Sequence, residues 1–215
     1  MKFNVALVLV CGLLAGCSTP QSNQPRTLKT TYSSFDQLEE VSDKSILGPG
    51  AINFKGAYLN QFLQVYQDIS ARTVISSPQL PQVSVTVQNA TPLSRTQALQ
   101  LFDSALAQHG VAMVYSGENV VKAVPVALAG QEAGPVVDLP AEKLPESSSY
   151  MVRFVRLEHH KPSEVVPLIQ PFAKVPNGII AMEKERMLVL RDFSNNIRQM
   201  LKLIEESEKA APTRR

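Results

Sequence analysis

The sequence predicts an α+β protein with two small mixed-sheet domains in tandem, at residues 51–128 and 150–208. Two observations lead to this prediction. Strand-like alternation and helix-like stripes of apolar residues follow one another twice along the chain. A segment with three prolines and two glycines, at residues 129–149, lies between the two patterns and is predicted to be a linker. The chain is 44% hydrophobic and has no Trp, which suits one or two modest cores.

Residues 1–16 are predicted to be a lipoprotein signal peptide. Lys2 supplies the only charge before an apolar run from Val5 to Leu14, and this run is shorter than the ~20 apolar residues of a membrane span. The run ends in the letters LAGC, which resemble the bacterial lipoprotein box, where the signal is cut before the cysteine and the cysteine, here Cys17, is acylated. The alternative is an ordinary secretory signal that happens to contain a cysteine.

Acylation of Cys17 would anchor the chain, because two or more acyl chains hold a protein firmly on a membrane. Ser18 stands where an aspartate would resemble the signal for inner-membrane retention, so the resemblance favours the periplasmic face of the outer membrane. Residues 17–50 are rich in Ser, Thr, Gln and Pro and are predicted to be a lipidated flexible tether. Because Cys11 lies in the signal, we expect no disulfide in the mature chain.

The first unit, residues 51–128, predicts the order β-α-β-β-α-β-β. Alternation of valine with polar residues predicts the strand at 83–87, and an apolar stripe at i, i+3, i+4 and i+7 predicts the first helix. Ser94, with Gln97 three residues later, predicts a capping box at the start of the second helix, and Gly110 is placed to end it. The predicted elements are strands at 52–54, 73–75, 83–87, 111–115 and 120–126, with helices starting near 59 and at 94.

The second unit, residues 150–208, predicts the order β-α-β-β-α, followed by a tail at 209–215. A helix begins near Pro162, and Pro167 inside it predicts that this helix is short or kinked, because an internal proline costs about 3 kcal/mol. Ser194 is predicted to cap the final helix. The predicted strands are 151–157, 179–182 and 188–190, the last two forming a hairpin across the letters EKER.

These patterns resemble a known family. The stretch from FKGAYLNQFL to NVVKAVP is similar to the first amino-terminal periplasmic domain of type II secretion secretins (GspD-like), a fold shared with the signalling domain of TonB-dependent receptors. The stretch from MVRFVRLEHH to LIEESEK is similar to the next, KH-like secretin repeat. A secretin continues into further repeats and a membrane-spanning barrel, and the residues after these stretches cannot form one. From this departure from the secretin pattern, we expect a lipoprotein form of the family that lacks the barrel.

The resemblance implies a non-enzymatic, outer-membrane-anchored periplasmic scaffold of a type II secretion or type IV pilus system. Its partners would be the inner-membrane or secretin components of that machine, with ring assembly possible beside a partner. The first unit is the stronger candidate, because its family counterpart contacts the inner-membrane component. Small sheets leave backbone groups that a partner strand can complete. The candidate contact residues are Ile52, Asn53, Phe54, Val83, Val85 and Val87.

Two alternatives stay open. The chain can be the amino-terminal piece of a truncated or split lipidated secretin, or an envelope enzyme. The sequence has no nucleophile elbow, phosphate loop or other catalytic motif, and we expect no catalytic residue and no cofactor. Adjacent His159 and His160 point apart in a strand or loop and lack a third ligand, so we expect no metal site.

Nucleic acid is not an expected partner. The chain has 21 Lys and Arg against 19 Asp and Glu, and its basic residues are not clustered beyond the last two. The loop KVPNGI of the second unit lacks the GxxG that clamps a nucleic-acid backbone in KH domains. The remaining charged candidates, Asp68, Arg72, Arg153 and Arg156, are predicted to lie on solvated faces of a helix and of a strand.

Overall fold

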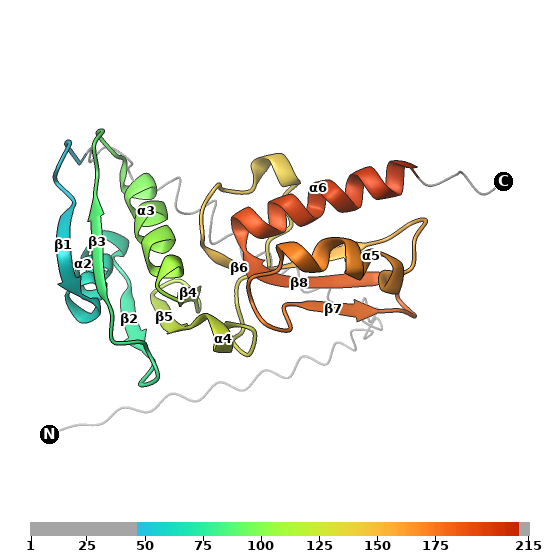
Figure 1. The fold of residues 1–215 in the computed structure, drawn as a ribbon, viewed down its shortest axis with the longest axis horizontal. Coiled ribbons are helices and arrows are strands. Elements are labelled where there is room, and N and C mark those ends of the chain that lie inside the picture. Colours follow the sequence, from blue (N-terminus) through green and yellow to red (C-terminus); the bar gives the residue numbers. More distant parts are fainter. Residues whose placement is uncertain (1–46, 211–215) are drawn as a thin grey trace, which may run out of the picture. The chain divides into compact units, whose positions relative to one another are not determined.

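The computed structural model describes residues 47–210, which lie within one compact body (Figure 1). The predicted signal peptide at 1–16, Cys17 and most of the tether fall outside the described residues, as do residues 211–215 of the tail. The described part is an α+β fold with small sheets, as predicted.

The first unit has the predicted order of elements. It consists of β1 (Asn53–Tyr58), α2 (Leu59–Ser70), β2 (Thr73–Ser76), β3 (Ser84–Gln88), α3 (Arg95–Gln108), β4 (Val111–Tyr115) and β5 (Val120–Pro125). The strands form two sheets. β1 and β3 pair antiparallel, and a separate sheet has the order β2-β5-β4, with β2 parallel and β4 antiparallel to β5.

The start and end of α3 are set by local sequence, as predicted. The Gln97 backbone N–H donates to Ser94 Oγ (3.2 Å), and the Ser94 N–H donates to Gln97 Oε1 (2.9 Å). This reciprocal capping box satisfies two backbone donors that the first helical turn leaves without partners. Gly110 has φ +75°, a left-handed conformation that turns the chain from α3 into β4.

The core of the first unit lies around α2 and α3, which separate the two sheets (Figure 1). The Phe62 and Phe102 rings stack with centroids 4.3 Å apart, and Phe54 of β1 meets Phe62 edge-on at 4.9 Å. Ile52 and Val85 close this core from the β1–β3 side, and Met113, Val121 and others close it from the side of β4 and β5. The helices therefore carry the apolar faces of both sheets.

Truncation of Phe102 tests this core. Phe102→Ala should lower the free energy of unfolding by about 3–5 kcal/mol, because the ring is fully buried between both helices and the sheets. Urea melts of the purified chain measure the change, with Ile75→Ala at a half-exposed position as control. A loss near zero for Phe102→Ala would contradict the packing described here.

The second unit also has its predicted order. It consists of β6 (Tyr150–Arg156), α5 (Pro162–Ile169), the 3₁₀ turn η2 (Gln170–Phe172), β7 (Ile179–Met182), β8 (Met187–Phe193) and α6 (Ser194–Ala210). The sheet has the order β6-β8-β7 and is antiparallel throughout. Helices α5 and α6 pack on one face of it and form a second core. α5 is a short helix of 8 residues and continues directly into η2, as the prediction of a short or kinked helix at Pro167 requires.

Ser194 does not cap α6, in contrast to the prediction. It is the first residue of the helix, and its hydroxyl donates to the Pro145 carbonyl (2.6 Å). The preceding segment caps the helix instead, because the N–H groups of Ser194 and Asn195 donate to the carbonyls of Ser149 (2.9 Å) and Ser147 (3.1 Å). Backbone acceptors from residues 147–149 thus replace the serine side chain.

Residues 129–149, the predicted linker, are packed in the structure. They follow the short helix α4 (Val126–Ala129) and contain the 3₁₀ turn η1 (Ala141–Lys143), and they bury Val137, Ala141 and Leu144 in the second core. The Val137 N–H donates to the Val152 carbonyl (2.9 Å), so the segment runs along β6. A Cβ at Gly134 would lie 2.5 Å from the Tyr150 ring, so only glycine fits this approach. The division of the chain into domains stays a prediction.

A third apolar cluster joins the two units. Ala112 and Val114 of β4, with Val124 of β5, lie on the face of their sheet that points away from α2 and α3. Tyr150 and other residues of the second unit cover this face. The buried members of the cluster are Ala107, Ala112, Val114, Val124, Ala129, Tyr150, Val175 and Phe193.

Candidate functional site: the open strand edges of the first unit

The β1–β3 pair has two open edges. Among residues 47–210, β1 and β3 pair only with each other. The Asn89 N–H donates to the Ile52 carbonyl (3.1 Å), so these two groups point toward each other across the pair. Asn53 and Gln88 are the next residues opposite each other, so their N–H and C=O groups point away from the pair. Each strand therefore offers backbone donors and acceptors at its outer edge.

The six predicted contact residues lie on this pair or beside it, but most of their side chains face the core. Ile52 (3% exposed) and Val85 (0%) are buried, and Phe54, Val83 and Val87 are half-buried against the same core. Asn53 is exposed. A partner would therefore meet the backbone of these strands and the outward side chains between the valines.

The β1 edge is interrupted, whereas β3 continues without a break. The register shifts between Phe54 and Ala57, where Gly56 has φ +69° and donates its N–H to Thr86 Oγ1 (2.9 Å). A bulge of this kind twists an edge away from continuous pairing. β3 therefore offers the longer regular edge, and β1 offers a short one around Asn53.

Asn89 holds the start of the pair, and the sequence analysis missed it. Its buried side chain accepts from the Ile52 N–H (2.9 Å) and donates to the carbonyls of Gly48 (2.8 Å) and Thr91 (2.9 Å). Gly48 belongs to the predicted tether, whose last described residues are thus fixed to the first unit, with Leu47 bridging Leu93. The signal in the sequence was an asparagine directly after the alternating run of β3.

The Asn89 network can be tested by truncation. Asn89→Ala should destabilise the protein by about 1–3 kcal/mol, because it leaves the buried N–H of Ile52 without an acceptor. Urea melts should show this loss, and Gln88→Ala, at the neighbouring exposed position, should change stability little. Equal stability of the two variants would contradict the role given to Asn89.

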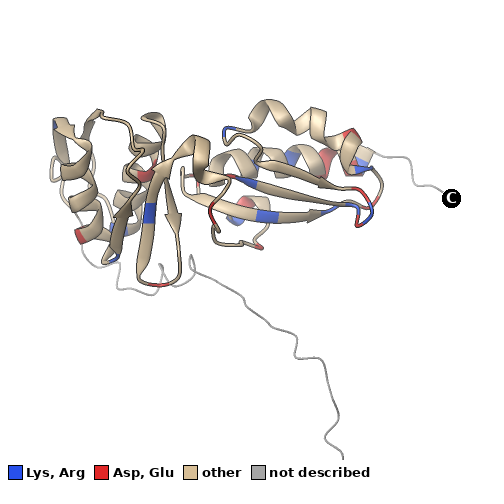
Figure 2. Cartoon of the chain, turned by 90° about the horizontal axis from the view of Figure 1, so that it is seen from below, with Lys and Arg blue, Asp and Glu red and all other residues tan. Residues whose placement is uncertain are grey.

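The open edges carry little charge. Figure 2 shows that charged residues are sparse in the first unit and more frequent in the second. Lys55 is the one charged residue within β1 and β3. Recognition at these edges would therefore depend on main-chain hydrogen bonds and apolar contacts, with weak dependence on salt.

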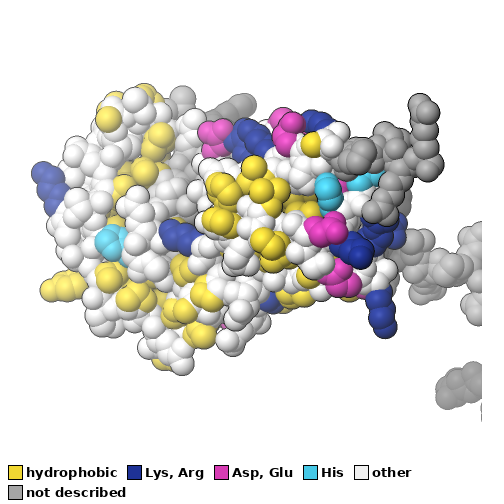
Figure 3. All heavy atoms as spheres, turned by 45° about the vertical axis from the view of Figure 1, so that its right-hand side comes forward, with side chains coloured by type: hydrophobic (Ala, Val, Ile, Leu, Met, Phe, Trp, Pro, Cys, Tyr) yellow, Lys and Arg dark blue, Asp and Glu magenta, His cyan; other side chains and the backbone are white. Residues whose placement is uncertain are grey.

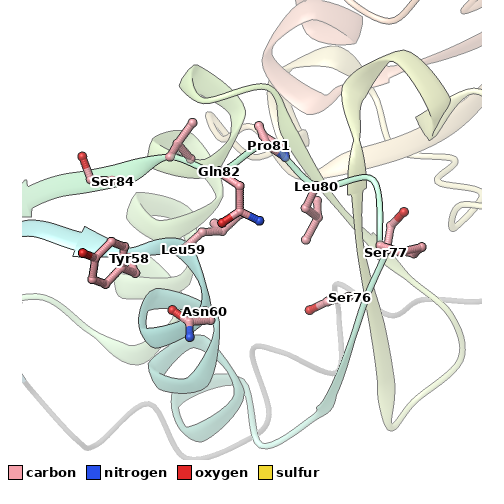
Figure 4. Close-up of a pocket in the computed structure, with 11 residues that line it drawn as sticks. Tyr58, Leu59, Asn60, Ser76, Ser77, Leu80, Pro81, Gln82 and Ser84 are labelled. Carbon is pink, nitrogen blue, oxygen red and sulfur yellow. The ribbon is translucent and has the colours of Figure 1, made fainter.

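A groove lies at the end of β1, where the chain enters α2 and where β2 leads toward β3 (Figure 4). Its volume is about 660 Å³, and Tyr58 at its rim is 71% exposed. The lining has no ionisable side chain other than this tyrosine, so the groove lacks the acid, base or metal-ligand set that catalysis needs. Its lining residues are Tyr58, Leu59, Asn60, Ser76, Ser77, Pro78, Leu80, Pro81, Gln82, Val83 and Ser84.

The second unit also exposes apolar side chains. Figure 3 shows a face on which hydrophobic side chains gather within this unit. The exposed large ones in β6, α5, η2 and β7 are Phe154, Leu168, Phe172 and Ile180. Among residues 47–210, no helix has the length and hydropathy of a membrane span.

The two adjacent histidines lie in the loop before α5. The Glu208 carboxylate accepts from the N–H groups of His159 (2.8 Å) and His160 (3.1 Å), and His160 Nδ1 lies 3.5 Å from Glu164. Within the described part of the chain, no three His, Cys, Asp or Glu side chains are grouped as metal ligands. Glu208 thus holds the loop to the end of α6.

Two arginines predicted on solvated faces have specific partners instead. The Arg72 guanidinium lies 4.9 Å from the centroid of the Tyr115 ring and donates to the Gly117 carbonyl (3.0 Å). Arg153 donates to the Val137 carbonyl (3.1 Å) and pairs with Asp138. Both side chains bind segments that are distant in sequence, which a local pattern cannot reveal.

Comparison with known proteins agrees with the geometry of the first unit. Residues 52–123 match the family model of the GspD-like N0 domain. The chain is 27% identical over 155 residues to secretin XcpQ of Pseudomonas aeruginosa, covering 72% of this chain and 22% of the relative. It is 29% identical over 146 residues to secretin XpsD of Xanthomonas campestris pv. campestris, covering 66% and 18%. The chain thus spans about a fifth of the length of these curated relatives.

A solved structure shares the fold. The type II secretion system outer membrane complex of Klebsiella pneumoniae, with PulD, PulS and the PulC HR domain, aligns with a TM-score of 0.62 at 24% identity, over 74% of this chain and 26% of that one. The α+β arrangement of both units is therefore that of a known fold. The family match identifies residues 52–123 as a GspD-like N0 domain, the first amino-terminal domain of this family.

Proposed function

We propose that this protein is a non-enzymatic periplasmic binding module of a type II secretion or type IV pilus system, held at the outer membrane by a lipid on Cys17. Its first unit binds the inner-membrane component of the machine, a PulC-like protein. The observation that carries the proposal is the match of residues 52–123 to the GspD-like N0 domain. The open edges of β1 and β3 supply a binding mode that needs no pocket chemistry.

A structural relative and the exposed edge of β3 both support a PulC-like partner. The Klebsiella complex that shares the fold contains a PulC HR domain beside PulD. A partner strand added to β3 would gain main-chain hydrogen bonds, while outward side chains such as Gln88 would select its sequence. Because only Lys55 is charged on this surface, binding rests on shape and backbone pairing.

An edge-blocking substitution tests the binding mode. Asn53→Pro removes one outward N–H and leaves the β1–β3 bonds in place, because proline is tolerated where a strand N–H faces away from the sheet. It should weaken binding of a purified PulC-like periplasmic domain at least about tenfold, the loss of roughly one well-made hydrogen bond with its packing.

Asn53→Ala is the matched control, since it keeps the N–H and removes the side chain. It should bind nearly as well as the wild type, and melts should confirm that both variants fold. Calorimetric titration measures the affinities. Equal binding by Asn53→Pro and the wild type would show that the β1 edge is not used, and Gln88→Pro would then test the β3 edge in the same way.

The anchor is tested separately. We expect Cys17→Ser to abolish incorporation of a fatty-acid analogue, because the thiol that would carry the diacylglyceryl group is absent. Membrane fractionation should then find the variant outside the outer-membrane fraction. Equal labelling of Cys17→Ser and wild type would contradict the lipoprotein assignment and favour an ordinary secretory signal.

A second candidate function rests on the same match. The chain aligns with about a fifth of each curated secretin, so it can act as the amino-terminal part of a longer or split secretin. A secretin-barrel reading frame directly downstream would favour this reading. Co-purification with a separate, complete secretin would favour the independent module.

A further inference from the structure

We infer that the contact between Asp103 of the first unit and Ser149 at the entry to the second unit is a proton-controlled latch, closed when the Asp103 carboxyl is protonated. The latch lies at the junction that the third apolar cluster forms. It is a property of the fold, separate from the open strand edges.

The geometry of the contact spans both units. Asp103 lies on α3 and is 2% exposed. Ser149 Oγ donates to Asp103 Oδ2 (2.5 Å), and Tyr66 Oη of α2 donates to Oδ1 (3.0 Å). One carboxyl oxygen therefore has its hydrogen-bond partner in the first unit, and the other has its partner in the segment that leads into β6.

Ser149 passes this contact on to the second unit. It is buried and receives a hydrogen bond from Ser147 Oγ (3.1 Å), and the carbonyls of both serines accept the first N–H groups of α6. Separation of the units at this point would expose Asp103 Oδ2 and the Ser149 hydroxyl to water. The contact thus couples the carboxyl group to the position of a whole helix.

No cation offsets the charge of Asp103. Within residues 47–210, no Lys, Arg or His forms an ion pair with this carboxylate. The groups that face it are the hydroxyls of Tyr66 and Ser149, and behind Tyr66 the Tyr115 hydroxyl (2.7 Å from Tyr66 Oη), with Arg72 over the Tyr115 ring. A buried carboxylate with only neutral donors is costly, and a protonated one is not.

Burial accordingly raises the pKa of Asp103 to about 7, although the hydrogen bonds from Ser149 and Tyr66 act in the opposite direction. In the separated state, water reaches the carboxyl and its pKa falls toward the ordinary value of an aspartate. The closed state therefore binds the proton more tightly. The junction is most stable below the ordinary aspartate pKa, loses stability as the pH rises toward 7, and stays loosened above it.

The other charged groups at the junction contact main-chain carbonyls, an aromatic ring or each other. Lys174 Nζ donates to the Ala107 carbonyl (3.3 Å) and lies over the Phe193 ring, and Arg191 Nη1 donates to the Gly130 carbonyl (2.5 Å). Burial raises the pKa of Tyr150 to about 12, so its hydroxyl stays neutral near pH 7. Lys122 and Glu132 form an ion pair beside the cluster.

Hydrogen–deuterium exchange of the full chain in detergent tests the latch. The amides of the peptide covering residues 145–150, corrected for the intrinsic effect of pH on exchange, should be about thirtyfold more protected at pH 5.5 than at pH 8.0, as a closed-state pKa near 7 requires. Asp103→Asn is the matched control, because it has the same shape and no charge, and its protection should be nearly equal at the two pH values.

Two results would overturn the inference. One is equal protection of residues 145–150 in the wild type at both pH values. The other is an unchanged pH response in Asp103→Asn, which would assign the effect to another group. If Asp103→Asn does not fold, a carbon-detected NMR titration of the wild-type Asp103 carboxyl decides instead. A titration midpoint near 7 supports the latch, and a midpoint near 4 excludes it.

Discussion

The burial of the β4–β5 face by the second unit is the constraint on which the rest of the structure depends. Helices α2 and α3 cover one face of the β2-β5-β4 sheet, and Tyr150, Val175 and Phe193 cover the other face along β4. Every residue of β4 is buried as a result. Within the first unit, the β1–β3 pair, on the other side of α2 and α3, and the groove beside it stay open for recognition. Anchoring the first unit in this way leaves its open edges available to a partner.

Polar contacts fix the relative position of the two units at this apolar junction. An apolar cluster alone permits sliding, since the hydrophobic effect is non-directional. The hydrogen bonds of Lys174 to the Ala107 carbonyl, Arg191 to the Gly130 carbonyl and Ser149 to Asp103 each need one relative position of the two units. Two of these bonds have a partner in residues 129–149, namely Gly130 and Ser149. The segment between the units is therefore part of the junction.

The elements of the fold could be predicted from the sequence, and the junction could not. Alternating valines located β3, and the Ser94–Gln97 box located the start of α3, because these signals are local. Ala107 and Ala112 gave no signal, since small residues at a helix end and in a strand have no pattern of their own. Prolines made residues 129–149 read as a linker, although Val137 and Leu144 are buried there. The partners of Asp103 and Arg72 lie far away in sequence, so only tertiary structure brings them together.

The partner-contact residues stay a prediction; the sequence located the strands that carry them but not the direction in which each side chain faces. The sequence pattern predicts contact residues on or beside β1 and β3, but tertiary structure decides that Ile52 and Val85 face the core while Asn53 faces outward. Amide chemical-shift mapping of the chain during titration with a PulC-like periplasmic domain is the most direct test of partner binding at the open strand edges. We expect the largest changes on Asn53 and on β3 up to Gln88. Changes centred on the second unit, or no changes at saturating partner, would contradict it.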